Sequence, residues 1–360
     1  MTCPDAKGVV AALSQLLYGL GCNIISSDQC VLVPVTSCDA ARGQEKRRLL
    51  DQEVSRPSAP RRYTDLSENV FFQRIAFDYS ELLVGPANTA ILENAMENVS
   101  QRFVMKWWIH YSAPRKRMAI LVSKSDHCLY DLLIRKESGE LNCEVRRRDP
   151  PSSPPRNPAL PLGCDPTATT TLPTPLSPPQ IPVIISNHAD LEHVASKFGV
   201  PFRHLPLDAA AAGGAEAAKA AQEAALERIL EEEKVELVVL ARYMQVLSRD
   251  FCERNAHRTI NIHHSFLPAF EGARPYHRAH ERGVKIIGAT AHYATADLDC
   301  GPIIEQDVTR ISHRDSVATM VRKGKDLERL VLARAVAAHL GNRVIVHGNR
   351  TVVFDEASTS

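Results

Sequence analysis

An amide, an imidazole and a carboxylate in the C-terminal half of the chain are of the types that carbonyl chemistry needs. Asn261 and His263 lie together in the segment 261–268, and Asp299 follows in a later turn. Asn261 could donate a hydrogen bond to a developing oxyanion, and His263 could transfer a proton. Asp299 could orient the imidazole. These three residues are therefore the first candidate site.

A β-strand is expected to carry two of them. Apolar and polar residues alternate over 258–263, which predicts a strand with Asn261 and His263 on one face. Pro268 cannot continue a central strand, so we expect both side chains near the strand terminus. In open α/β sheets, ligands bind at the carboxyl ends of the strands.

Other interpretations stay open at this point. Taken singly, Asn261 could satisfy loop backbone, His263 could be an interior histidine, and Asp299 could be an ordinary turn carboxylate. A zinc site is a further possibility, although no His-Glu-x-x-His or His-x-His pair sets two ligands on one face. Its ligands would come from one group of histidine and aspartate residues, namely His263, His264, His277, His280, His292 and Asp299.

Two common enzyme classes lack their motifs. Ser265 has no Gly-x-Ser-x-Gly elbow. It would also have to act as a nucleophile only two residues along the chain from its base, His263, which disfavours a Ser-His-Asp hydrolase. No Gly-x-Gly-x-x-Gly follows an expected strand, so a dinucleotide cofactor is disfavoured as well.

Composition limits the partners. The 360 residues are enough for two domains of roughly 150 residues each. The net charge of +1 gives no reason to expect binding to nucleic acid or to a membrane surface. The nine cysteines include no Cys-x-x-Cys pair, which favours reduced thiols inside the cell. No apolar run approaches the ~20 residues of a membrane span.

The N-terminal part predicts a small α+β domain over residues 1–102. Apolar spacings predict two helices and two strands, at 7–21, 23–27, 69–78 and 86–102. The polar stretch 34–67 is too long for a hairpin turn, so we expect it to be an insertion.

The C-terminal part, 115–354, predicts an α/β domain with a mainly parallel sheet, because strands alternate with helices. Strands are expected at 117–123, 182–187, 237–241, 259–263, 284–293, 302–311 and 343–346. Helices are expected at 127–136, 189–198, 215–233 and 315–340. The proline-rich stretch at about 149–180 is expected to be a second insertion.

A set of motifs in the chain resembles those of the formyltetrahydrofolate deformylase family. The motifs lie at 122–129, 240–244, 261–268, 272–277, 288–293, 299–304 and 348–350. The resemblance implies an N-terminal ACT domain followed by a formyltransferase-type α/β domain. It also implies hydrolysis of 10-formyltetrahydrofolate to tetrahydrofolate and formate, without a metal or redox cofactor and with a role in purine synthesis.

The same resemblance assigns roles to residues. It implies that Asn261, His263 and Asp299 are catalytic. It further implies a group of residues at the folate substrate, namely Arg242, Tyr243, Met244, His264 and Gly272.

Two other functions are weighed against hydrolysis. A formyltransferase would pass the formyl group to an amine acceptor, and a phosphorylated acceptor would want a glycine-rich anion cradle after the first strand of the domain. Residues 122–128 contain no glycine, which disfavours it. A folate-binding protein without catalysis is disfavoured by the intact Asn261, His263 and Asp299.

The resemblance also leads to expectations about regulation and location. ACT domains normally begin with a strand, and only Met1 and Thr2 precede Cys3, so we expect that strand to be missing. A small amino acid could act as an effector near residues 19–23. We expect a homo-oligomer in the cytoplasm, or in the mitochondrion if a transit peptide is missing.

Overall fold

The computed structural model describes residues 1–32, 70–82, 89–111, 116–141, 181–208, 214–268 and 275–355. Both expected insertions, at 34–67 and about 149–180, lie outside these residues. The chain divides into two compact units, Met1–His110 with Phe354–Ser360, and Tyr111–Val353.

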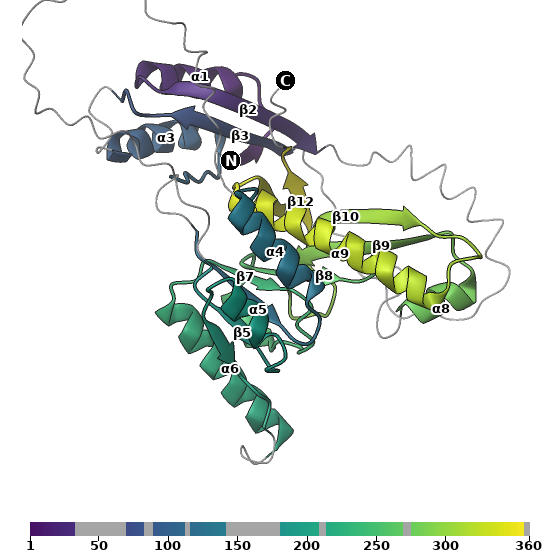
Figure 1. Cartoon of the computed structure of the whole chain (residues 1–360). Helices are drawn as coiled ribbons and strands as arrows, with labels where there is room; N and C mark the ends of the chain where they lie inside the picture. The colour runs from purple at the N-terminus through teal and green to yellow at the C-terminus, as the bar shows by residue number, and fades with distance from the viewer. Residues whose placement is uncertain are drawn as a thin grey trace, which may run out of the picture. The chain divides into compact units, whose positions relative to one another are not determined.

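The first unit contains a three-stranded antiparallel sheet in the order β1-β3-β2, and its described residues also form the helices α1 and α3 (Figure 1). Its elements are β1 (Thr2–Pro4), α1 (Val9–Gly19), β2 (Asn23–Leu32), β3 (Val70–Asp78) and α3 (Thr89–Phe103). The core joins Leu13 and Leu17 of α1 to Leu92 and Met96 of α3 and to Phe71 of β3. The helical spacing of the apolar residues thus buries one face of each helix.

The prediction that the first strand is missing is wrong. Three residues form β1, with Thr2 opposite Phe72 and Cys3 opposite Phe71. On its other side, Thr2 exchanges two backbone hydrogen bonds of 2.8 Å with Lys106. The strand is stable despite its length because Thr2 pairs on both sides and Cys3 is buried in the core.

The second unit is built on a seven-stranded sheet in the order β10-β9-β8-β7-β4-β5-β6. Its strands are β4 (Met118–Val122), β5 (Ile184–Ser186), β6 (Phe202–His204), β7 (Leu237–Leu240), β8 (Thr259–His263), β9 (Ile286–Tyr293) and β10 (Ile303–Arg310). Five of them, from β8 to β6, run parallel, and β9 and β10 add antiparallel pairs. The expected mainly parallel α/β sheet is therefore confirmed.

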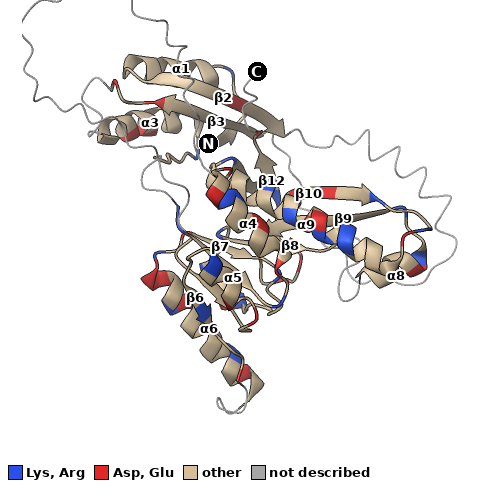
Figure 2. Cartoon of the chain, viewed as in Figure 1, with Lys and Arg blue, Asp and Glu red and all other residues tan. Residues whose placement is uncertain are grey.

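Both faces of this sheet are buried. Met118, Ile120 and Val122 of β4 belong to one core cluster, while Ala119 and Leu121 belong to another. This alternation follows from the two-residue repeat of a strand, and it explains why the strand is a continuous apolar run. Figure 2 shows Lys, Arg, Asp and Glu on the helices and on the edge strand β10, whereas the central strands β4, β7 and β8 carry none of these four residue types.

Among the described residues of this unit, six helices lie around the sheet: α4 (His127–Ser138), α5 (Glu192–Lys197), α6 (Ala215–Glu232), α7 (Arg249–Arg254), α8 (Pro275–Arg282) and α9 (Val317–Leu340). Helices α4 and α9 share the first core cluster, through Leu129 and Leu133 on α4 and Val331 and Val336 on α9.

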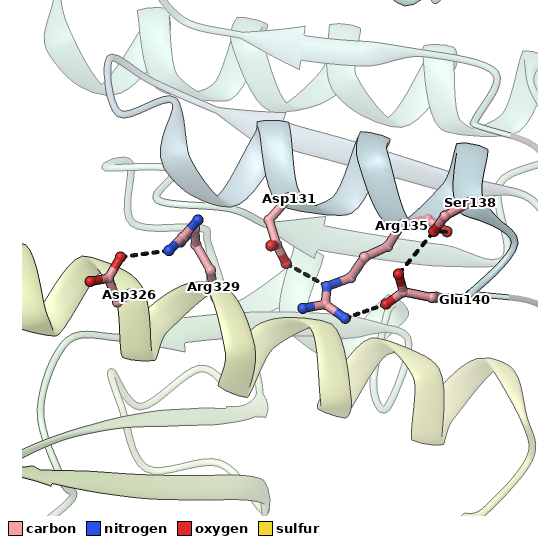
Figure 3. A network of polar contacts seen from close by, with 6 residues as sticks. All are labelled: Asp131, Arg135, Ser138, Glu140, Asp326 and Arg329. Carbon is pink, nitrogen blue, oxygen red and sulfur yellow. Dashed lines mark hydrogen bonds and ion pairs between the residues drawn. The ribbon is translucent and has the colours of Figure 1, made fainter.

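Figure 3 shows two separate polar networks on neighbouring sides of α4 and α9. Arg135 donates to Asp131 at 2.7 Å and to Glu140 at 2.5 Å. On α9, Arg329 donates to Asp326 at 2.5 Å. Partly exposed ion pairs of this kind contribute little to stability, so apolar burial is the main interaction that holds the two helices together.

The elements that the sequence did not predict are short or polar. Besides β1, they are β6, α7, α8 and β12 (Arg350–Val353), which pairs with β11 (Val344–His347). Helix α7 is capped by Ser248, whose hydroxyl accepts from the Phe251 N–H at 3.2 Å. Within the described ranges, no helix combines the length and apolarity that a bilayer crossing requires.

Candidate active site

The candidate residues meet where the parallel part of the sheet changes to antiparallel. Asn261 and His263 lie on β8, and β9 pairs with β8 so that His292 stands directly opposite Asn261. Directly opposed residues of an antiparallel pair project their side chains on the same face. Here the Asn261 amide nitrogen lies 3.2 Å from His292 Nε2.

Asp299 closes the group from the turn after β9. Its Oδ2 lies 3.1 Å from His263 Nδ1, and its Oδ1 lies 3.6 Å from His292 Nε2. The structure thus brings together Asn261, His263 and Asp299, as expected from the sequence, and adds His292 between them.

The turn that presents Asp299 is tightly constrained. Asp299 has a φ of 56°, which is costly for a residue other than glycine, about 1–2 kcal/mol. The turn closes because the Tyr293 N–H donates to the Pro302 carbonyl at 2.9 Å. Gly301 lies against the same strand, and an added Cβ there would fall 1.7 Å from the Tyr293 carbonyl oxygen. Only glycine fits this approach.

Hydrogen bonds keep Asp299 ionised. Burial alone would raise the pKa of its carboxyl, but the hydrogen bond with His263 and the nearby His292 imidazole outweigh burial and hold that pKa well below its usual range. A fixed negative charge therefore faces both imidazoles at neutral pH.

The opposite nitrogen of His263 is available for chemistry. His263 is 6% exposed, and its Nε2 makes no hydrogen bond within the described residues. Because Nδ1 is directed at Asp299, Nε2 points away from the carboxylate and is the ring nitrogen left without a partner among the described residues.

His292 orients the amide of Asn261. Its Nδ1 donates to the Tyr293 carbonyl at 2.9 Å, so in the neutral imidazole Nε2 can only accept. It then accepts one N–H of Asn261, which leaves the second N–H for a ligand oxygen. When protonated, His292 can donate from Nε2 to Asp299 instead.

A cleft opens beside this group. Its walls come from the segment after β7, including Tyr243, Val246 and Leu247, and from the turn after β9, including Leu298. Asn261, His292 and Asp299 supply polar groups to its lining. An apolar cleft with a few converging polar groups is typical of a small-molecule site.

The residues that were predicted to bind the substrate do not all lie at the cleft. Tyr243 lines the cleft, whereas Met244 is 63% exposed and does not line it. Arg242 is directed instead at the buried Glu328. His264 packs on the His263 ring, and Gly272 lies outside the described residues. The substrate-binding role of each stays a prediction.

His264 is uncharged near neutral pH. Burial, reinforced by the positive charge of Arg242, lowers the pKa of His264 to about 4. Its ring centroid lies 5.1 Å from that of His263 and 6.0 Å from that of Tyr276. It therefore supports His263 as a packed, neutral neighbour.

Among the described residues, one group of side chains has metal-ligand types within reach of one another: His127, Cys128 and Glu328. Arg242 lies 3.5 Å from Glu328 and already balances its charge, which disfavours a cation there. Burial raises the pKa of the Cys128 thiol well above its ordinary value, so this cysteine is a poor metal ligand near neutral pH.

The sequence reasoning missed His292 as a partner of Asn261, and it missed the apolar wall formed by Val246, Leu247 and Leu298. The polar–apolar alternation of 284–293 indicates a strand there. It does not reveal which residue of that strand lies opposite Asn261, because strand register depends on tertiary contacts.

Comparisons with known proteins agree with this architecture. A family model described as formyl transferase matches residues 176–336. The chain is 42% identical to a formyltetrahydrofolate deformylase from Synechocystis sp., over 98% of this chain and 96% of the relative.

Solved structures give the same result. A formyltetrahydrofolate deformylase from Pseudomonas syringae pv. tomato has a TM-score of 0.71 and 36% identity, covering 98% of this chain and 92% of its own. A glycinamide ribonucleotide transformylase from Symbiobacterium toebii has a TM-score of 0.53 and 27% identity, covering 70% of this chain and 99% of its own.

The close approach at Gly301 gives a testable prediction. Gly301→Ala should push the turn away from β9 and lower the thermal unfolding midpoint, since overpacking costs about 1–3 kcal/mol. Gly19→Ala is the control, because an added Cβ there meets nothing within 4 Å. An unchanged midpoint in Gly301→Ala, matching the control, would contradict the packing described for the turn.

Proposed function

The chain belongs to the formyltetrahydrofolate deformylase family, and on this premise we propose that it hydrolyses 10-formyltetrahydrofolate to tetrahydrofolate and formate. The observation that carries the proposal is the meeting of Asn261, His263 and Asp299 beside a largely apolar cleft. The cleft suits the flat ring system of a folate, and the polar group suits its formyl carbon.

The chemistry follows from the positions of these groups. Asp299 stays anionic and holds a water molecule against the formyl carbon. As the water oxygen bonds to that carbon, the carbonyl oxygen gains negative charge. The second N–H of Asn261 and a proton on His263 Nε2 stabilise it; removing one such donor typically costs ~3 kcal/mol of barrier.

The carbon–nitrogen bond then breaks. His263 donates its proton to the departing folate nitrogen, which leaves as a secondary amine. One proton of the attacking water passes to His263 and restores its protonated form, and the other, as the acidic proton of formic acid, goes to solvent. The route uses no metal ion and no redox cofactor.

Transfer of the formyl group to an amine is the second candidate, because a transformylase shares the fold. A phosphorylated acceptor would favour the N-terminus of α4, where helix N–H groups attract anions. His127, the first residue of α4, lies 2.9 Å from the carboxylate of the buried Glu328. An anion of the protein itself is therefore already present there, which favours hydrolysis.

The biological setting is also a proposal. The formate released would supply purine synthesis, and the enzyme would act in the cytoplasm, with the mitochondrion as the alternative. The cysteines of the described residues are all free, in keeping with a reducing compartment. An amino-acid effector and a homo-oligomeric assembly rest on the family resemblance.

Removing the charge of Asp299 tests the mechanism. Asp299→Asn should lower kcat by about 10²–10⁴-fold, because the amide cannot hold His263 and water as the carboxylate does. The affinity for tetrahydrofolate should change by less than about threefold. Asp297→Asn, an exposed carboxylate of the same turn, is the matched control. Near-normal turnover in Asp299→Asn would remove Asp299 from the mechanism.

The choice of acceptor is tested on the unmodified protein. Formate and tetrahydrofolate should appear in equal amounts from 10-formyltetrahydrofolate, without any amine acceptor and with a chelator present. Formyl loss only after glycinamide ribonucleotide is added would make the protein a transferase. Loss of activity in chelator that a divalent metal restores would contradict the metal-free route.

A further inference from the structure

Arg242 adopts a backbone conformation that disfavours an arginine. Its φ is 64°, in the left-handed region where glycine is the usual residue. A strained residue persists only where the surrounding contacts hold it. The contacts of the Arg242 side chain therefore indicate what holds this conformation.

The side chain of Arg242 pairs with a single buried carboxylate. Glu328 lies on α9, and its side chain is 2% exposed. Arg242 Nε lies 3.5 Å from Glu328 Oε2, and His127 Nε2 lies 2.9 Å from the same oxygen. The Tyr276 hydroxyl donates to Oε1 at 2.8 Å. One carboxylate thus connects α9 to α4, to α8 and to the end of β7.

Glu328 remains ionised in this setting. Burial would raise the pKa of its carboxyl, but His127, Arg242 and Tyr276 outweigh burial and lower it. The space around it is also shaped for these contacts. An added Cβ on Gly324, one turn earlier in α9, would lie 1.9 Å from the Tyr276 hydroxyl.

The left-handed backbone at Arg242 directs its side chain and the residues that follow it to different places. Arg242 itself is held against α9, while Tyr243 and residues 245–247 line the cleft. A second anchor acts two residues later, where the Met244 N–H donates to Ser123 Oγ at 3.0 Å. Ser123 in turn donates to Asn187 at 2.6 Å. The wall of the cleft is therefore fixed at its start by two contacts.

We propose that Glu328 is a positioning residue for substrate binding: by holding Arg242 in its left-handed conformation, it keeps Tyr243 and residues 245–247 in place as the wall of the folate cleft. Glu328 does not line the cleft, so it acts through Arg242. The inference rests on the proposed function, because it names the folate as the molecule that this wall contacts.

The proposal predicts an effect on binding more than on chemistry. Glu328→Gln keeps the size of the side chain and an acceptor for Tyr276, but it removes the charge that holds Arg242. We expect KM and the dissociation constant of tetrahydrofolate to rise about tenfold, with kcat within about threefold.

A double-mutant cycle tests whether Glu328 acts through Arg242. Arg242→Gly removes the side chain and also relieves the backbone strain, since glycine tolerates this φ. If the two residues act as one unit, the double variant should bind tetrahydrofolate no more weakly than Arg242→Gly alone. Losses that multiply in the double variant would show independent roles and overturn the proposal.

Asp326→Asn is the matched control. Asp326 lies two residues before Glu328 on α9, is 62% exposed, and pairs with Arg329 (Figure 3). This variant should leave KM and the dissociation constant unchanged. A purely structural role for Glu328 would lower the melting temperature of Glu328→Gln without changing either constant, and that result would also overturn the proposal.

A second pair of variants serves if Glu328→Gln does not fold, since it leaves a cation unpaired in the interior. Arg242→Lys keeps a positive charge for Glu328, and Arg242→Gly does not. The lysine variant should recover most of the affinity that the glycine variant loses, and equal losses would contradict the proposal. Tetrahydrofolate affinity is measured without turnover, so an enzyme that binds folate but does not hydrolyse would refute only the proposed function.

Discussion

The contact between Asp299 and His263 is the interaction on which the rest of the site depends. It joins the end of β8 to the turn after β9 through atoms 3.1 Å apart, and it fixes which nitrogen of His263 is directed at the carboxylate. The turn can deliver the carboxylate only because Gly301 approaches β9 without a side chain and Asp299 accepts a left-handed backbone. Strain of this kind is common where a fold holds a functional group in place.

The sheet supplies the remaining geometry. Strand β8 pairs in parallel with β7 and antiparallel with β9, so the site receives the end of a parallel strand on one side and a hairpin-like turn on the other. The segment after β7 gives the apolar wall that begins at Tyr243, and the turn after β9 gives the charge of Asp299. A cleft between such segments combines a binding surface with a reaction centre.

The sequence predicted what depends on local pattern. The strand expected at 259–263 coincides with β8, and the alternation correctly placed Asn261 and His263 on one face. It could not predict that His292 stands opposite Asn261, because register is decided by the packing of whole strands. Nor could it predict the pairing of Arg242 with Glu328, which lie on separate elements and meet only in the folded chain. The prediction that the first strand is missing was wrong, because it considered only the length of the segment and not its backbone pairing on both sides.

The central claim is that water, held by Asp299 and His263, attacks the formyl carbon. The most direct test is to run the reaction in water enriched in ¹⁸O and to measure the mass of the formate at early times. Our account predicts that each formate carries one oxygen atom from the solvent and that tetrahydrofolate carries none. Formate without solvent oxygen would show that the formyl group leaves by another route, and it would contradict the assignment of Asn261, His263 and Asp299 as a hydrolytic site.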